Sequence, residues 1–204
     1  MLGRLHHHLI YRRRVRVLGE RIAGLLPPSA QVLDVGCGDG AVATAVMTSR
    51  PDVKIHGIDV LVRTAARISV EPFDGASIPA DDRSIDVVML VDVLHHTNDP
   101  AALLREAARV ARRAVVVKDH CAADAVDRAT LRAMDWVGNA RHGVALPYNY
   151  WSEAKWRRET VRLVLQPDVW EQKLDLYPRP LSLLFDRRLH FVARFVRVAV
   201  AQAA

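Results

Sequence analysis

The stretch Val32-Leu33-Asp34-Val35-Gly36-Cys37-Gly38-Asp39-Gly40 decides the fold of this chain. An apolar strand runs into a turn with three glycines, and residues 41–47 after it have helical character. A backbone that bends this sharply needs residues that tolerate positive φ angles and let a ligand approach the main chain, which glycine supplies. N–H groups at the start of the following helix can face a polar ligand. The stretch therefore predicts a strand, a turn and a helix with a binding site at the turn.

Strands and helices alternate on either side of this turn. Strands are predicted at 31–35, 54–60, 69–73, 84–91 and 114–118, and helices at 4–26, 41–50, 63–67 and 101–113. The run Ser84–Val91 is almost continuously apolar, which is typical of a strand buried on both faces of a parallel sheet. The order predicts a doubly wound α/β fold, and ligands bind such sheets beyond the carboxyl ends of the strands.

The pattern loosens after Lys118. Helices are predicted over 127–137 and 153–163, and 169–177 and 189–198 read as a closing antiparallel pair. The expectation is one domain over 1–204 with a mostly parallel seven-stranded sheet and an antiparallel last strand. Within it, 1–28 is an N-terminal helix and 120–165 is a lid over the substrate.

Composition limits the class of protein. Half of the residues are hydrophobic, no run of 18 apolar residues occurs, and the N-terminus lacks the apolar core of a signal peptide. Cys37 and Cys121 make neither a disulfide framework nor a metal-ligand spacing. We therefore expect a cytoplasmic protein.

The net charge of +6 permits two interpretations. The excess arginine either serves an anionic partner or covers solvated faces. Because no ordered basic and aromatic pattern is present, we expect no nucleic-acid partner. Contact with a membrane surface is the less favoured alternative, and the mixed basic and apolar segment 187–197 motivates it.

These motifs resemble a known family. Asp34-x-Gly36-x-Gly38-x-Gly40 after a strand resembles the first motif of class I S-adenosylmethionine-dependent methyltransferases. Asp59 at the end of the second strand, Asp74-Gly75 after the third, and the later stretch Val91-Asp92-Val93-Leu94-His95-His96 resemble the type 11, small-molecule branch. The resemblance covers residues 15–120. It implies a Rossmann-like fold, S-adenosylmethionine as cofactor with S-adenosylhomocysteine as product, and a small-molecule acceptor.

The resemblance assigns the cofactor contacts. Asp59 would accept hydrogen bonds from both ribose hydroxyls, Asp74 would accept from the adenine amine, and Asp34 would order the turn. The expected cofactor-binding residues are Asp34, Gly36, Cys37, Gly38, Gly40, Asp59, Val60, Asp74, Gly75, Val91 and His96.

Methyl transfer to a hydroxyl also needs a base for its proton, a contribution of roughly 10²–10⁴-fold. His120 is the first candidate because it directly follows the fifth strand, and a histidine titrates near neutral pH. A plain hydrogen-bonded loop histidine is the alternative. Asp119 and His95 are further candidates. His95 and His96 are adjacent in sequence and are expected to point apart, so no metal site is predicted.

The loop-rich part after residue 134 is the expected substrate wall. Asn139, Tyr148 and Tyr150 are predicted to contact the acceptor, whereas Trp136 and Trp151 are expected to pack against the sheet. A nicotinamide dehydrogenase is disfavoured by the glycine spacing. A module that binds S-adenosylmethionine without catalysis, and a methyltransferase for lipid or RNA, remain as alternatives.

Overall fold

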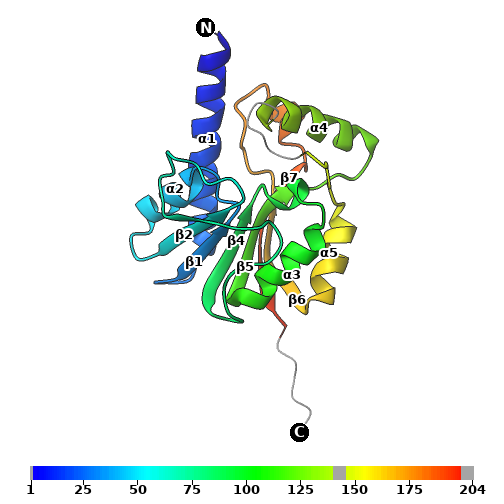
Figure 1. The fold of residues 1–204 in the computed structure, drawn as a ribbon. Helices are drawn as coiled ribbons and strands as arrows, with labels where there is room; N and C mark the ends of the chain where they lie inside the picture. Colours follow the sequence, from blue (N-terminus) through cyan, green and yellow to red (C-terminus); the bar gives the residue numbers. More distant parts are fainter. Residues whose placement is uncertain (1, 140–145, 199–204) are drawn as a thin grey trace.

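A seven-stranded sheet forms the centre of the molecule. The computed structural model describes residues 2–139 and 146–198. The strands lie in the order β3-β2-β1-β4-β5-β7-β6, and Figure 1 shows this sheet between the helices. Their bounds are β1 Gln31–Val35, β2 Lys54–Asp59, β3 Val70–Pro72, β4 Ile85–Val91, β5 Ala111–His120, β6 Leu165–Gln172 and β7 His190–Arg197. Strands β1 to β5 are parallel and β7 is antiparallel to both of its neighbours, which confirms the predicted sheet.

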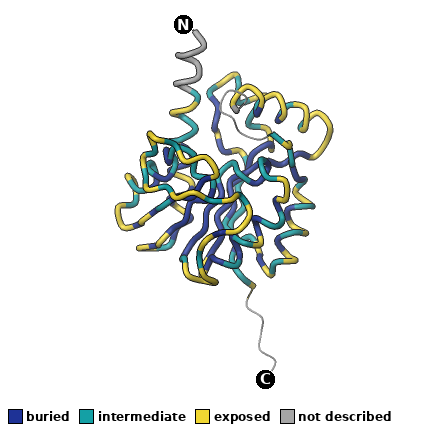
Figure 2. The backbone as a smooth tube through the Cα atoms, viewed as in Figure 1, coloured by how far each residue is buried: buried dark blue, intermediate teal, exposed yellow. Residues whose placement is uncertain are grey.

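Helices cover both faces of the sheet. They are α1 Leu2–Leu25, α2 Ala41–Ser49, α3 Pro100–Val110, α4 Ala125–Asn139, α5 Glu153–Arg162 and α6 Ser182–Phe185, with a 3-10 helix η1 at Leu94–His96. Leu18 and Ile22 of α1 are buried in one hydrophobic cluster, and Leu103 and Leu104 of α3 in another. Figure 2 shows the buried strands between these layers.

The central strand explains why its sequence is continuously apolar. Val87 and Met89 of β4 pack in the cluster with α1, whereas Val88 and Leu90 pack in the cluster with α3. Successive side chains of a strand point to opposite faces, so burial on both faces requires apolar residues at every position. The apolar run 84–91 is therefore a direct consequence of the helices that cover both faces of the sheet.

Three sequence-based expectations about the elements are wrong. Residues 63–67 form turns in place of a helix, because the Arg67 N–H donates to the Asp39 carbonyl at 2.9 Å and ties the segment to the glycine turn. Helix α3 ends at Val110, and the next residue already pairs with Ile85 of β4. Strand β6 covers 165–172, and residues 173–177 lie beyond it.

The segment 187–197 is for the most part not a free surface. Strand β7 occupies 190–197 and hydrogen-bonds to β5 on one side and β6 on the other. Residues His190 to Ala193 are buried. The segment proposed from sequence for membrane contact is therefore mainly a strand of the sheet. Within the described residues no helix is long and apolar enough to cross a membrane.

The carboxyl ends of the parallel strands meet at one edge. Helix α4 lies above this edge, and the N-terminal half of α1 extends past it on the other side (Figure 1). The carboxyl edge is thus the part of the sheet where polar side chains from several elements can converge.

Candidate functional site

The turn after β1 combines tight packing with an open main chain. Gly36, Gly38 and Gly40 have φ angles of +71°, +60° and +73°, a region that side-chain-bearing residues rarely adopt. A Cβ at Gly36 would meet Val93 at 2.6 Å, and one at Gly40 would meet Ile68 at 2.7 Å. A Cβ at Gly38 would meet nothing within 4 Å. Two glycines are therefore required for packing, and the middle one leaves the backbone accessible to a ligand.

Asp59 holds this turn from the end of β2. One carboxylate oxygen accepts from the Gly38 N–H at 2.8 Å, and the other accepts from the Leu61 N–H at 2.8 Å. Each oxygen keeps a second lone pair. Asp59 can therefore order the turn and still accept from a hydroxyl. The ordering role expected of Asp34 falls to Asp59 in this structure.

The carboxyl group of Asp34, in β1 just before the turn, is buried and incompletely hydrogen-bonded. Its side chain is buried, and its Oδ1 atom has no hydrogen-bond partner in the part of the chain that the structure describes. Burial, together with the charge of Asp59, raises the pKa of Asp34 to about 8. A buried polar atom without a partner costs free energy, so the site fits a ligand that brings a donor.

The rest of the expected cofactor surface lies around the ends of β2 and β3. Asp74 accepts from the N–H groups of Ala76 and Ser77, both at 2.8 Å, and these bonds lower the pKa of its carboxyl. Val60 exposes an apolar side chain beside Gly75. A hollow of about 580 Å³ adjoins the turn and is lined by Asp39, Leu61, Val62, Arg63, Thr64, Ala65 and Arg67. An exposed apolar side chain next to ordered carboxylates suits a flat base and a ribose.

Cys37 and Val91 complete the expected set on this side. Both side chains are half-buried. Burial, with Asp34 and Asp59 nearby, raises the pKa of the Cys37 thiol to about 12. Cys37 is therefore a neutral packing residue at neutral pH and not a reactive thiolate.

Replacing Asp59 with alanine is expected to weaken the binding of S-adenosylhomocysteine by roughly 30- to 150-fold. This corresponds to about 2–3 kcal/mol for lost hydrogen bonds to a charged acceptor. Titration calorimetry measures it. The control is Asp86→Ala, because Asp86 also accepts from a backbone N–H, at Gln31, but lies at the amino end of β4. Equal affinities of the two variants would mean that Asp59 does not contact the ligand.

A second group of polar side chains lies beside the first, at the ends of β4 and β5. Asp92 follows β4 with a φ angle of +58°, a conformation that is rare outside glycine and concentrates at functional sites. Its carboxylate accepts from Lys118 of β5 and from Arg14 of α1 at 3.0 Å. Arg14 also donates to the Tyr177 hydroxyl at 2.6 Å. Burial opposes charge on Asp92, but Lys118 and Arg14 hold the pKa of its carboxyl well below the usual value.

Asp119 at the end of β5 is the organiser of this group. Its side chain is buried and accepts from the Leu94 N–H at 3.1 Å, from the His120 N–H at 2.7 Å and from His95 Nδ1 at 2.6 Å. Burial would raise the pKa of Asp119, but the charge and hydrogen bond of His95 lower it. Three hydrogen bonds therefore occupy most of the acceptor positions of Asp119, which suits positioning better than proton transfer.

His95 is held between two carboxylates. Its Nε2 atom lies 3.5 Å from Asp135 on the inner face of α4. Burial by itself would lower the pKa of His95, but Asp119 and Asp135 outweigh it and raise the pKa. Both carboxylates therefore favour the protonated, charged form of His95, which balances part of their charge.

His120 has the opposite environment. Its ring stacks on His95 with 4.3 Å between centroids, its Nδ1 lies 3.2 Å from His190 Nδ1, and its Nε2 lies 3.6 Å from Asp135. Burial and the charges of His95 and Lys118 lower the pKa of His120 to about 4. His120 is therefore a neutral imidazole at neutral pH, able to accept a proton.

The low pKa of His120 has a consequence for stability. The unfolded chain binds this proton near pH 6.5, but the folded chain binds it only near pH 4, so stability falls as the pH drops through this window. Between pH 7 and pH 5 the loss is about 2 kcal/mol. His120→Gln has no imidazole that could titrate at this position. Between pH 7 and pH 5 its free energy of unfolding is therefore expected to decrease by about 2 kcal/mol less than that of the wild type. Urea denaturation at both pH values measures it, and parallel losses would contradict the assignment.

The two adjacent histidines converge, which corrects the expectation that they point apart. The 3-10 turn η1 brings the rings of His95 and His96 to 4.0 Å between centroids. One nitrogen of each and an Asp135 oxygen all lie within 4.8 Å of one another, as do ligand atoms of Asp92, His95 and His120. These groups have metal-ligating chemistry. However, the Asp92 charge is already balanced by Lys118 and Arg14.

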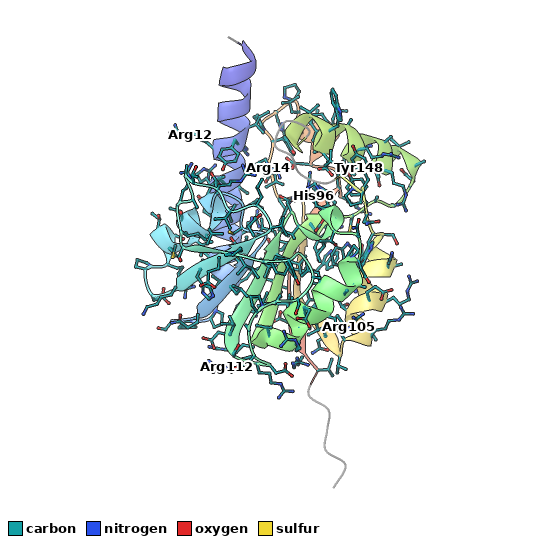
Figure 3. The ribbon with its side chains drawn as sticks, in the orientation of Figure 1. Arg12, Arg14, His96, Arg105, Arg112 and Tyr148 are labelled. Atoms are coloured by element: carbon teal, nitrogen blue, oxygen red, sulfur yellow. The ribbon has the colours of Figure 1, made fainter. Side chains whose placement is uncertain are left out.

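The expected substrate residues lie on the α4 side of this edge. Tyr150 is buried and donates to Asp135, and burial together with this hydrogen bond raises the pKa of its hydroxyl. Tyr148 is half-buried under the Arg132 guanidinium, 4.7 Å from its ring centroid. In Figure 3, His96 and Tyr148 lie toward the same edge as Arg14. The side chain of Asn139 is outside the described residues.

The two tryptophans behave differently. Trp151 is buried and packs on Trp156, as expected. Trp136 is 64% exposed, so the expectation that it packs against the sheet is wrong.

Sequence reasoning missed several members of this edge. They are Arg14, Lys118, Asp135, Tyr177 and His190. Two of them carry a usable signal. Lys118 is a cation that directly follows the apolar run Ala114–Val117. Asp135 follows Leu131 at helical spacing on the buried face of α4. A charge on an otherwise buried face needs a partner, which points to a buried polar network.

Comparison with known proteins agrees with this geometry. The family model of a methyltransferase domain matches residues 5–160. The chain belongs to this methyltransferase family. The result confirms the resemblance to class I S-adenosylmethionine-dependent methyltransferases, and the residues around the glycine turn fit the cofactor of that family.

Named relatives of this methyltransferase chain are similar over part of their length. The 27-O-demethylrifamycin SV methyltransferase of Amycolatopsis mediterranei is 34% identical in an alignment of 110 residues that covers 47% of this chain and 40% of that protein. The ubiquinone biosynthesis O-methyltransferase of Hahella chejuensis is 31% identical in an alignment of 120 residues that covers 52% of this chain and 47% of that protein. The matched segment thus spans less than half the length of either relative.

Solved structures show the same fold. A possible histamine N-methyltransferase from Thermotoga maritima aligns with a TM-score of 0.67 at 19% identity, covering 96% of this chain and 95% of that one. Magnesium protoporphyrin IX methyltransferase from Synechocystis with bound S-adenosylhomocysteine aligns with a TM-score of 0.59 at 16% identity, covering 95% and 84%.

Proposed function

We propose that this protein transfers a methyl group from S-adenosylmethionine to a hydroxyl oxygen of a small molecule, with His120 as the general base. The observation that carries the proposal is a buried neutral imidazole at the carboxyl edge, beside the glycine turn. The relative from Hahella chejuensis is an O-methyltransferase by name, which favours oxygen as the acceptor atom.

The glycine turn packs against the residue that precedes the segment with His95 and His96. Val93 packs on Gly36, and η1 begins at the next residue, Leu94. The residues that would hold the cofactor therefore sit one turn of chain from His95. When bound, S-adenosylmethionine supplies a methyl group that is already activated by its sulfonium. The protein has to align the acceptor, exclude water and accept one proton.

The contacts of His120 support its role as the base. Its Nδ1 atom lies 3.2 Å from His190 Nδ1, and its Nε2 atom faces the Asp135 carboxylate at 3.6 Å. A neutral imidazole keeps a lone pair on one ring nitrogen, which can take the hydroxyl proton. The resulting imidazolium is stabilised by Asp135 at 3.6 Å and by Asp92, whose carboxylate lies 4.0 Å from Nδ1.

The segment above the edge suits a lid. Helix α4 presents Asp135 inward to His95 and His120, and Tyr150 donates to the same carboxylate. A cover of this kind excludes bulk water, which strengthens every electrostatic interaction beneath it. We therefore assign acceptor contacts to Tyr148 and Tyr150 in the segment that connects the lid to α5.

The test is a transfer assay with a set of phenols, hydroxylated polyketides and hydroxyquinols. We expect one acceptor to gain the mass of one CH2 group, because a methyl group replaces the hydroxyl hydrogen, with one equivalent of S-adenosylhomocysteine released. Two outcomes favour the alternatives. Calorimetric binding of S-adenosylhomocysteine without transfer to any acceptor would indicate a binding module, and methylation of total RNA in place of small molecules would move the acceptor to nucleic acid.

A further inference from the structure

Helix α4 is apolar on the side that faces away from the protein. The residues Val126, Ala129, Ala133, Trp136 and Val137 are all exposed, and each lies three or four residues from another member of the set. This set, here called the α4 stripe, therefore lies along one face of the helix. Trp136 and Val137 are 64% and 73% exposed. The opposite face buries Leu131 and Asp135.

Helix α6 carries two further exposed apolar side chains. Leu183 and Leu184 are exposed at 68% and 59%. The chain after α6 is tied to the start of α4, because Arg187 lies 3.8 Å from Asp127. Figure 1 shows α6, in orange, beside α4 at the same end of the molecule. Both helices thus carry exposed apolar side chains at this end of the molecule, and exposed apolar patches mark contact sites.

The charges around these apolar residues are mainly positive. The exposed arginines of α4 and of the chain around α6 are Arg128, Arg132, Arg179, Arg187 and Arg188. Two acids in the same region are engaged. Asp127 is paired with Arg187, and Asp186 accepts from the N–H groups of Leu176 and Tyr177. Asp124 is exposed, and five arginines against these three acids leave an excess of two positive charges.

We propose that the α4 stripe and α6 dock on an anionic lipid membrane. An apolar helix face that carries tryptophan and is flanked by arginine is the arrangement that binds in the plane of a bilayer surface. Anionic headgroups complement the arginines. A second copy of this chain would bring a like-charged ring of arginines against the first, which opposes self-association through this surface.

The same helix connects the membrane to the catalytic edge. Its inner face presents Asp135 to His95 and His120, and its outer face carries the next residue, Trp136. Docking would hold the lid against the bilayer, so that an acceptor dissolved in the membrane meets the protein beside α4. That statement about the acceptor rests on the proposed function, whereas the docking itself does not.

Sedimentation of the full chain with vesicles tests the docking without any methyl transfer. We expect binding to vesicles of phosphatidylglycerol and phosphatidylcholine, little binding to phosphatidylcholine alone, and release at high salt. Trp136→Asp and Val137→Asp are each expected to weaken binding about tenfold, because a carboxylate at the interface loses apolar contact and repels the headgroups. Leu183→Asp tests α6 in the same way.

The matched control is Val161→Asp. Val161 is 70% exposed on α5, so the substitution adds the same charge at a similarly exposed valine away from α4. Circular dichroism verifies that every variant is folded. The proposal is overturned if the wild type does not sediment with anionic vesicles, or if Val161→Asp weakens binding as much as Val137→Asp. It is also overturned if ultracentrifugation without lipid shows a dimer that Val137→Asp converts to monomer.

Discussion

Replacing Asp119 with alanine is expected to lower the free energy of unfolding by about 3–5 kcal/mol, the cost of removing one partner of a buried ion pair. Asp119 and His95 are both nearly inaccessible to solvent and lie 2.6 Å apart. Without the carboxylate, a buried imidazolium loses its nearest counter-charge. The N–H groups of Leu94 and His120 lose their acceptor as well. Urea denaturation at neutral pH measures the change.

Asp168→Ala is the matched control for this measurement. Asp168 also pairs with a cation, Arg194, but both side chains are about one-third exposed. Exposed pairs contribute about 0–1 kcal/mol. Asp119→Asn separates charge from shape, since its amide oxygen can still accept one backbone N–H. If Asp119→Ala unfolds no more easily than Asp168→Ala, Asp119 is not the residue that organises the carboxyl edge.

Local sequence patterns were sufficient to predict the sheet and the glycine turn. The doubly buried β4 has to be apolar at every position, and the glycines at 36, 38 and 40 have to adopt positive φ angles. Both requirements constrain neighbouring residues in the chain, so they can be recognised from the local sequence. The same holds for Asp59, because a carboxylate at the end of a strand next to the turn can be located by counting residues.

Tertiary contacts decided the parts that the sequence did not predict. Residues 63–67 have helical composition, but a backbone bond to Asp39 holds them in turns. Asp135 reaches His95 and His120 only because α4 folds back over β5. Nothing in the local sequence encodes that return. The opposite protonation states of His95 and His120 follow from which carboxylates and cations surround each ring, a property that exists only in the fold.

Replacing His120 with alanine is expected to lower kcat by roughly 10²–10⁴-fold, the usual contribution of a general base. S-adenosylhomocysteine affinity is expected to stay within about twofold of the wild type, since the cofactor contacts come from the turn after β1 and the end of β2. His120→Gln keeps a hydrogen-bonding side chain but cannot accept the proton, so it is expected to be as slow as the alanine variant. Initial rates at saturating cofactor, together with calorimetry, measure both quantities.

The control is His56→Ala, which removes a half-buried histidine from β2. It is expected to leave kcat unchanged, which shows that loss of any one imidazole is not sufficient. The pH dependence adds a second readout. A base with a pKa of about 4 is already deprotonated at pH 6, so the wild-type rate has no His120 limb between pH 6 and pH 8. A His120→Ala variant with wild-type kcat would place the base elsewhere. A wild-type rate that decreases as the pH falls below about 6.5, with no such decrease in His120→Gln, would show that acceptor binding changes the surroundings of the ring.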